Sequence, residues 1–374
     1  MPYWNATCNH RWNKTSETLF KIFQLVVLYI LISTVVDTFM SNSLEIVLGS
    51  LNMSDHISYT LVYSSYIIPN AFIRIANVLY ATDLTEIIVS VSSLGGQFEG
   101  KIGSGIIFII FGLLSIPILS FALYEILRDD VNSFLCANLT SYLFPSTSVI
   151  PVHVFLDFVS YTGVMHAYLF MGVFGILILN IFERLVKSFE KNHLQKLIWT
   201  GQGAPTSNGF VQSLEQLTKE AFALKHTMDN YSKIAGVYFL ALLYHAAANW
   251  FRFLNHVTNG NKVSFLVNSM ALNIFSIVAI GYLAFFGNYL SKRAYKIKEK
   301  LLAANVLIGS PQPRSDATFY KITQVSTWIL TWEWKLSAFE MWDVNHVVIS
   351  TVFSAILPCM ILIFQLRISE STGK

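Results

Sequence analysis

Charged residues are scarce in this chain of 374 residues: 13% are Asp, Glu, Lys or Arg, while 54% are hydrophobic. Soluble domains carry about 25% charged and about 45–50% apolar residues. The composition therefore excludes an ordinary soluble domain and indicates an integral membrane protein. A formal net charge of +3 is too small to indicate nucleic acid as a partner, so the lipid bilayer is the expected one.

Cysteines and catalytic motifs are also few or missing. The three cysteines, Cys8, Cys136 and Cys359, lie far apart, which argues against a disulfide framework. The sequence has no phosphate-binding loop, no dinucleotide fingerprint and no HExxH motif, and its nine histidines never occur four residues apart. We therefore predict no catalytic residue, metal or cofactor; an enzyme would need residues from distant helices to converge. The first residues also lack the pattern of a signal peptide, so the first span should act as its own insertion signal.

Long apolar runs are what the chain has instead. About twenty apolar residues at ~1.5 Å each form a helix that crosses a ~30 Å hydrocarbon layer. Seven segments meet this test: Leu19–Met40, Tyr59–Tyr80, Ile102–Ile126, Val152–Phe182, Ile234–Leu254, Val263–Leu290 and Val344–Leu366. The second contains Pro69, Asn70, Arg74 and Asn77, and without it the count is six. The prediction is an all-α membrane protein with seven transmembrane helices.

The basic residues lie mostly on one side of the predicted spans. Eighteen of the 25 lysines and arginines fall in the N-terminal arm and the second, fourth and sixth connections, against four in the other connections and the tail. By the positive-inside rule, the N-terminus is cytoplasmic and the C-terminus extracellular.

Two cytoplasmic connections carry helical patterns. Leu214, Leu217, Ala221 and Leu224 recur at spacings of three and four, so the fifth span should continue into the cytosol. Lys292–Leu302 extends the sixth span in the same way, and a further helix capped by Asp316 should follow. These extensions should form an anchor bundle under the membrane.

The last span carries a mixed face. Thr351, Ala355, Pro358, Leu362 and Gln365 are spaced by four, three, four and three residues, so they share one side of a helix. Small residues on such a face suit a helix-packing seam. A glutamine amide within an apolar span instead suits the wall of a water-filled path, because it is costly unless paired or hydrated. Both interpretations stay open on spacing.

Polar and aromatic residues also gather in the outer halves of earlier spans. They are Tyr63 and Tyr66 on the second, His153, Asp157 and Tyr161 on the fourth, and His245, Asn249 and Trp250 on the fifth. Hydrogen bonding between helices or anchoring at the interface explains any one of them. Converging, they would form a small-molecule pocket, and they are our candidate ligand-binding residues.

Three classes of membrane protein fit seven spans. A G-protein-coupled receptor would place its N-terminus outside, against the charge pattern. A transporter usually has paired halves, and no internal repeat is visible. A channel needs a hydrated helix face repeated by symmetry around an axis, and the last span offers one.

The segment from Lys335 to Arg367, KLSAFEMWDVNHVVISTVFSAILPCMILIFQLR, resembles the arthropod chemoreceptor superfamily of gustatory and odorant receptors. Gustatory receptors end their last helix with Thr-Tyr, five hydrophobic residues and Gln-Phe. Here Met360–Phe364 precede Gln365, while Pro358 and Cys359 replace Thr-Tyr and Leu366 replaces Phe. The chain is most similar to a divergent gustatory receptor or gustatory receptor-like protein.

The resemblance implies a chemosensory, ligand-gated, non-selective cation channel in the plasma membrane, a homo- or hetero-tetramer opened by a tastant or other small molecule. Gln365 takes the place of the family's pore glutamine, and Leu362 and Leu366 lie near its hydrophobic gate, with Pro358 one turn before. Three regions follow: 1–182 with the ligand pocket, 183–343 with the anchor extensions, and 344–374 with the pore helix. The alternative is a seven-span receptor that signals through a partner without its own pore, and after it a transporter or intramembrane enzyme.

Overall fold

A computed structural model of the chain describes residues 14–29, 31–32, 67–97, 149–194, 208–258, 263–308, 333–338 and 342–372, together with residues 327 and 331. The helices are residues 14–29, Ile67–Leu79, α4 (Ala81–Gln97), α7 (Val149–Phe189), α9 (Asn208–Thr258), α10 (Val263–Ile308) and α12 (His346–Thr372). A π-helical turn, η1 (Glu190–Leu194), continues α7. Within these residues the only strands are β1 (Ser337–Ala338) and β2 (Trp342–Asp343), an antiparallel pair with Ser337 opposite Asp343. The all-α prediction is confirmed.

The longest helices exceed the thickness of a bilayer. α9 has 51 residues, which corresponds to about 75 Å at ~1.5 Å per residue, and α10 has 46. Because the hydrocarbon layer is ~30 Å thick, each helix must project far beyond it. The predicted extensions of the fifth and sixth spans are therefore confirmed as continuous helix.

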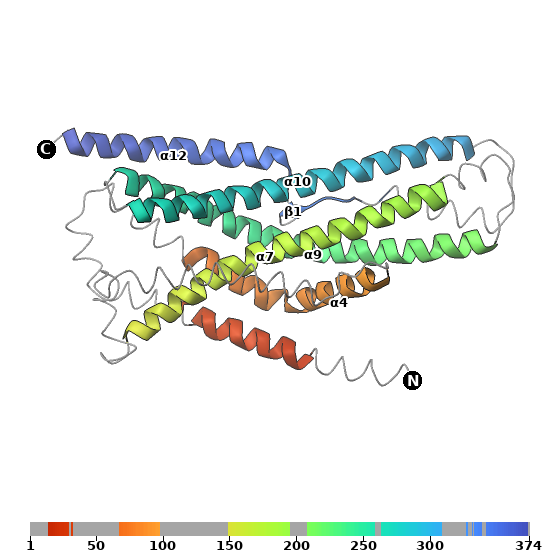
Figure 1. The fold of residues 1–374 in the computed structure, drawn as a ribbon, viewed down its shortest axis with the longest axis horizontal. Helices are drawn as coiled ribbons and strands as arrows, with labels where there is room; N and C mark the ends of the chain where they lie inside the picture. Colours follow the sequence, from red (N-terminus) through yellow and green to blue (C-terminus); the bar gives the residue numbers. More distant parts are fainter. Residues whose placement is uncertain are drawn as a thin grey trace.

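Figure 1 shows α7, α9 and α10 side by side; α9 runs in the direction opposite to α7 and α10. On the right of this view they extend well past the start of α12, which runs beside α10 toward the left. On α9, Leu214, Leu217, Ala221 and Leu224 are all buried, so the apolar face read from the sequence packs in the bundle. The projecting ends are thus packed helices.

Some boundaries differ from those expected. Helix Ile67–Leu79 leads through Tyr80 directly into α4, which the sequence analysis did not predict. Backbone bonds from Tyr80 N to Ala76 O and from Leu84 N to Tyr80 O, both 2.8 Å, join the two helices. The third predicted span and the helix after Asp316 lie outside the described residues, apart from residues 327 and 331. α12 continues to Thr372, past the expected end at Leu366 and through Pro358 without interruption.

α9 is the central helix of the described part, in contact with α4, α7, α10, α12 and β1. Aromatic rings fill the space around it: the Phe170 ring lies 5.7 Å from Tyr231 and 5.4 Å from Tyr238, and Tyr231 lies 5.9 Å from Phe286. The first pair is stacked and the other two are edge-on, and aromatic pairs prefer both arrangements. The Tyr231 hydroxyl donates to Met171 O at 2.7 Å, so its polar end is satisfied in the core.

Two helical stretches in the described part are long and apolar enough to cross a membrane, Gly163–Asn192 and Gln212–Phe251. Large apolar side chains also point outward on α10, where Val278 and Phe285 are 63% and 59% exposed. Together with the composition, these features identify a membrane protein.

Candidate functional site

Arg74 is the most unusual buried residue of the described part. It lies on the apolar helix Ile67–Leu79, is 4% exposed, and donates from Nη1 to Gln24 Oε1 at 2.8 Å. Its guanidinium carbon lies 6.0 Å from the centre of the Phe23 ring. Charged groups in membrane helices are expensive and usually mark function or specific pairing.

Asn70 and Asn77, both 0% exposed, lie one turn before and nearly one turn after Arg74. Asn77 Oδ1 accepts a hydrogen bond from the Tyr238 hydroxyl of α9. On the other side, a methyl group at Gly163 of α7 would overlap Asn70 Oδ1, so the Asn70 side chain lies directly against the backbone of α7. These residues form what we call the Arg74 cluster: Gln24, Asn70, Arg74, Asn77 and Tyr238.

A second polar cluster joins α7, α9 and α10. The Tyr168 hydroxyl donates to Ser276 Oγ at 2.8 Å. Asn249 Nδ2 lies 2.9 Å from His245 Nε2, and Asn273 Nδ2 donates to the backbone oxygen of Asn249 at 3.4 Å. We call these five residues the Asn249 cluster; each is less than a tenth exposed.

Several buried polar atoms have no hydrogen-bond partner among the described residues. They are Asn77 Nδ2, His166 Nε2, Asn249 Oδ1, Asn273 Oδ1 and the Tyr282 hydroxyl. A buried polar group without a partner costs about 1–3 kcal/mol, and native proteins keep few of them. Such groups are therefore candidates for contact with a ligand.

The structure brings together two of the predicted ligand-binding residues, His245 and Asn249. Trp250 is half-buried and packs edge-on against Phe253 at 6.0 Å, and none of its described contacts is with the Asn249 cluster. His153, Asp157 and Tyr161 lie on the first turns of α7, but their side chains are outside the described part, as are Tyr63 and Tyr66 entirely.

The sequence analysis did not single out Tyr168, Asn273 or Ser276. Asn273 and Ser276 are three residues apart within an apolar span, so they share a face of α10. That spacing could have predicted a polar face on this span. The partner on α7, Tyr168, became visible only once the helices were packed.

One face of α12 is uncovered in the single chain. Its exposed residues include a row spaced by four, three, four, four, three and four: Val347, Thr351, Ser354, Pro358, Leu362, Gln365 and Ser369. Leu362 is 67% exposed. An apolar row lies beside it, formed by Leu357, Ile361, Phe364 and Ile368. We call the first row, which combines apolar and polar side chains, the mixed row. Of the predicted pore residues, Pro358, Leu362 and Gln365 belong to it, while the Leu366 side chain is not described.

The base of α12 is fixed to α9 and α10. Ser232 Oγ of α9 accepts from Ser337 N at 2.9 Å and donates to Ser337 O at 3.2 Å, which holds β1. A methyl group at Gly287 of α10 would overlap Val344 O, so the chain passes directly against that glycine. Asn345 Oδ1 then caps α12 by accepting from Val347 N at 2.9 Å.

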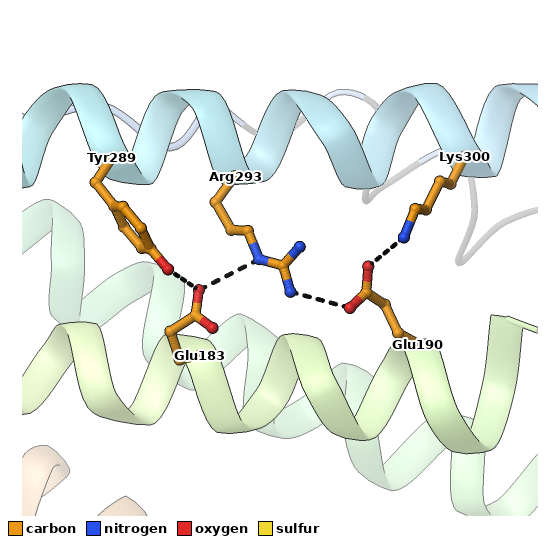
Figure 2. A network of polar contacts seen from close by, with 5 residues as sticks. All are labelled: Glu183, Glu190, Tyr289, Arg293 and Lys300. Atoms are coloured by element: carbon orange, nitrogen blue, oxygen red, sulfur yellow. Dashed lines mark hydrogen bonds and ion pairs between the residues drawn. The ribbon is translucent and has the colours of Figure 1, made fainter.

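A polar network ties the C-terminal part of α7 and η1 to α10, as Figure 2 shows. Glu183 Oε1 accepts from the Tyr289 hydroxyl at 2.8 Å and from Arg293 Nε at 3.3 Å. Arg293 Nη2 also donates to Glu190 Oε2 at 2.9 Å, and Lys300 Nζ reaches Glu190 Oε1 at 2.7 Å. Partial burial lowers the pKa of Arg293, but Glu190 and Glu183 together outweigh it, so the pKa lies above its ordinary value.

Among the described residues, no group of three or more His, Cys, Asp or Glu side chains is placed to hold a metal ion. The arrangement is one of packed helices with buried hydrogen-bonding clusters and an uncovered last helix.

No protein-family model matches the chain, and no curated protein matches it in sequence. Solved structures do match. The olfactory receptor OR5 of the insect Machilis hrabei aligns with a TM-score of 0.60 at 13% identity, over 96% of this chain and 99% of that receptor. The same receptor in complex with eugenol aligns with a TM-score of 0.56, also at 13% identity, over 96% and 98% of the two chains.

At 13% identity this similarity shows the fold, which is that of an insect olfactory receptor over nearly the full length of both chains. It supports the resemblance to the arthropod chemoreceptor superfamily at the level of the fold, without separating the gustatory from the odorant branch. Both of these solved structures are of an olfactory receptor.

Proposed function

We propose that this chain is a subunit of a chemosensory, ligand-gated, non-selective cation channel in the plasma membrane. The observation that carries the proposal is the shared fold with an insect olfactory receptor across 96% of this chain and 99% of that one. A match of this extent leaves no large part of either chain without a counterpart. The gustatory branch is favoured by the five hydrophobic residues followed by Gln365.

The last helix is the proposed pore wall. In a single chain, the mixed row of α12 has no covering element among the described residues, although Leu362 is 67% exposed. Four copies around one axis would turn this row inward, as closed cyclic symmetry requires each copy to present the same face. Leu362 and Leu366 would then form a dewetted constriction, and the Gln365 amides would hydrate the ion.

The ligand is proposed to be a small molecule bound among the outer halves of the helices. Eugenol, a small organic molecule, occupies one of the solved receptors with this fold. His245 and Asn249 are the candidates that the described packing brings together. Trp250, Tyr63, Tyr66, His153, Asp157 and Tyr161 remain proposed members of the pocket.

The proposed topology is multi-pass, with seven spans, a cytoplasmic N-terminus and an extracellular C-terminus. The distribution of lysine and arginine supports it, because 18 of 25 lie on one side of the predicted spans. Residues 1–182 would then hold the pocket, 183–343 the anchor extensions, and 344–374 the pore helix. The Glu183–Arg293–Glu190 network would lie in the cytoplasmic anchor.

A current measurement tests the proposal. The chain is expressed in cells that lack G-protein signalling, without and with odorant receptor co-subunits, and screened with small organic molecules. A ligand-evoked cation current is expected. No current under either condition would favour the alternative, a receptor that signals through a partner without its own pore.

Gln365→Ala then tests the pore helix. We expect a changed conductance or ion preference at unchanged surface expression, because the amide that hydrates the ion is lost. The matched control is Ile368→Ala, on the neighbouring exposed apolar row of the same helix, which should leave ion preference unaltered. If conductance and ion preference are both the same in the Gln365 variant and the wild type, the pore assignment is wrong.

A further inference from the structure

Two buried asparagine side chains lie at the α9–α10 interface, one on each helix. Asn249 on α9 is 1% exposed and Asn273 on α10 is 2% exposed. Asn273 Nδ2 donates to the backbone oxygen of Asn249 at 3.4 Å, so the Asn273 side chain lies directly beside residue 249. Asn249 Oδ1 and Asn273 Oδ1 both lack a hydrogen-bond donor among the described residues.

The hydrogen-bond pattern identifies the amide atoms of Asn273. A backbone oxygen can only accept, so the atom that Asn273 directs to Asn249 O must be its nitrogen. Asn249 Nδ2 lies 2.9 Å from His245 Nε2 and donates to it when the neutral ring carries its proton on Nδ1. In that tautomer the two remaining amide atoms are both oxygens, and each can only accept.

The neighbouring polar groups of the cluster are already engaged. Tyr168 donates to Ser276 Oγ at 2.8 Å, one turn from Asn273. Its hydroxyl hydrogen is thereby used within the cluster. Among the described residues of this interface, the two amide oxygens thus lack donors, in a span where an unsatisfied polar group is costly.

We propose that Asn249 Oδ1 and Asn273 Oδ1 form the acceptor site for the hydroxyl group of a small-molecule ligand that inserts between α9 and α10. The inference rests on the proposed ligand-gated function and narrows the ligand to compounds with a hydrogen-bond donor, such as alcohols and phenols. An ether of the same shape offers only an acceptor and cannot satisfy either oxygen.

Binding at this site requires movement. Side chains that are 1% and 2% exposed leave no space for a ligand while the helices are in contact, so the ligand binds the conformation in which α9 and α10 have parted. A ligand shifts an equilibrium by its differential affinity for the two states, which the new hydrogen bond donated by its hydroxyl group supplies. Because α10 contacts the base of α12 at Gly287, its displacement is transmitted to the last helix.

A matched pair of probes tests the proposal: phenol, which carries a donor, and anisole, its methyl ether. The full chain in lipid nanodiscs is titrated with each probe at equal membrane concentration, and the thermal shift is recorded. We expect phenol to stabilise the wild type more than anisole does. Asn273→Leu should raise the half-maximal phenol concentration about five- to tenfold, the effect of one hydrogen bond, with anisole unchanged.

Asn249→Leu is the second variant and should act in the same direction. Ser276→Ala is the matched control: it loses the bond to Tyr168 on the same face of α10, so it should lower the melting temperature and keep the preference for phenol. Without any probe, Asn273→Leu should melt close to wild type, because it removes a buried oxygen with no donor among the described residues together with the long 3.4 Å bond to Asn249 O.

Three results would each overturn the site: equal shifts with phenol and anisole, no shift with phenol, or an Asn273→Leu variant that still prefers phenol. The same results are expected if the two oxygens contact only water. The proposed function fails separately. If the wild type prefers phenol in nanodiscs but shows no ligand-evoked current, the proposed binding site stands and the proposed channel function is refuted.

Discussion

At the scale of single residues, two tyrosine hydroxyls in the bundle differ in what they contact. Tyr238, 0% exposed, donates to Asn77 Oδ1 of the Arg74 cluster. Tyr238→Phe would leave the Asn77 side chain with no hydrogen bond to α9 in the apolar interior. We expect a loss of about 1–2 kcal/mol of unfolding free energy, measured as a lower melting temperature in detergent or nanodiscs.

Tyr282 provides the comparison, because its hydroxyl is buried without a partner among the described residues. Tyr282→Phe should therefore be neutral or slightly stabilising. If the two variants melt at the same temperature, the Tyr238–Asn77 bond contributes nothing, and the Arg74 cluster does not hold Ile67–Leu79 against α9.

At the scale of elements, the contact between α10 and the base of α12 depends on a glycine. A methyl group at Gly287 would meet the backbone oxygen of Val344, which cannot turn away as a side chain can. Gly287→Ala should push the start of α12 off α10, at a cost of about 1–3 kcal/mol. We expect an altered ligand concentration for half-maximal current, or current without ligand, in electrophysiological recordings.

Gly281→Ala is the control on the same helix, since a methyl group there meets nothing within 4 Å. Alanine is favoured over glycine inside helices by about 1 kcal/mol, so this variant should be as stable as wild type or more so, with unchanged gating. Altered gating in both variants would mean that helix propensity, and not the contact with Val344, is responsible.

The network between α7 and α10 also belongs to the element scale. Arg293 joins Glu183 and Glu190, and Arg293→Met would leave these two carboxylates without their shared cation. A loss of about 1 kcal/mol is expected, because the groups are partly exposed and water screens them. The difference in melting temperature from wild type should shrink at high salt, where attraction and repulsion are both screened.

Lys300→Met is the control within the same network. Lys300 contacts only Glu190 in the network and its side chain is 53% exposed, so its removal should change the melting temperature little. A larger effect for Lys300 than for Arg293 would contradict the bridging role that the geometry gives to Arg293.

At the scale of the whole molecule, the uncovered face of α12 bears on assembly. A helix that exposes Leu357, Ile361 and Leu362 at 58%, 48% and 67% is either bathed in lipid or covered by other copies. We expect single-particle images of the purified protein, or of its complex with a co-subunit, to show four last helices around one axis. Monomers, or assemblies with α12 on the outer rim, would refute the pore.

The long helices could be predicted from the sequence because periodicity is local. Leu214, Leu217, Ala221 and Leu224 marked the continuation of α9, and the spacing up to Gln365 marked the mixed row of α12. α4 was missed because its apolar residues are interspersed with charged and small ones, so packing against α9 rather than pattern strength stabilises it.

The candidate site was predictable only in part. The spacing of His245 and Asn249 put both on one face of α9, where the structure indeed pairs them. Arg74 and Asn77 were noted in the second span as polar interruptions, yet both are fully built into the bundle. The sequence around Arg74 does not predict Gln24 as its partner, and the sequence around Asn77 does not predict Tyr238. These contacts join residues 50 and 161 positions apart.

The sequence by itself determined that this is a helical membrane protein, which helices continue beyond the bilayer, and which residues share a face of the last helix. Composition and spacing suffice for these, since they depend on transfer into lipid and on the helical repeat. Only the tertiary structure decided which face meets which neighbour. It shows that Asn273 lies against Asn249 and that the backbone at Val344 packs directly against Gly287. It also shows that the mixed row of α12 is left uncovered. The physical reason is that periodicity defines a face, while packing between distant segments decides what covers it.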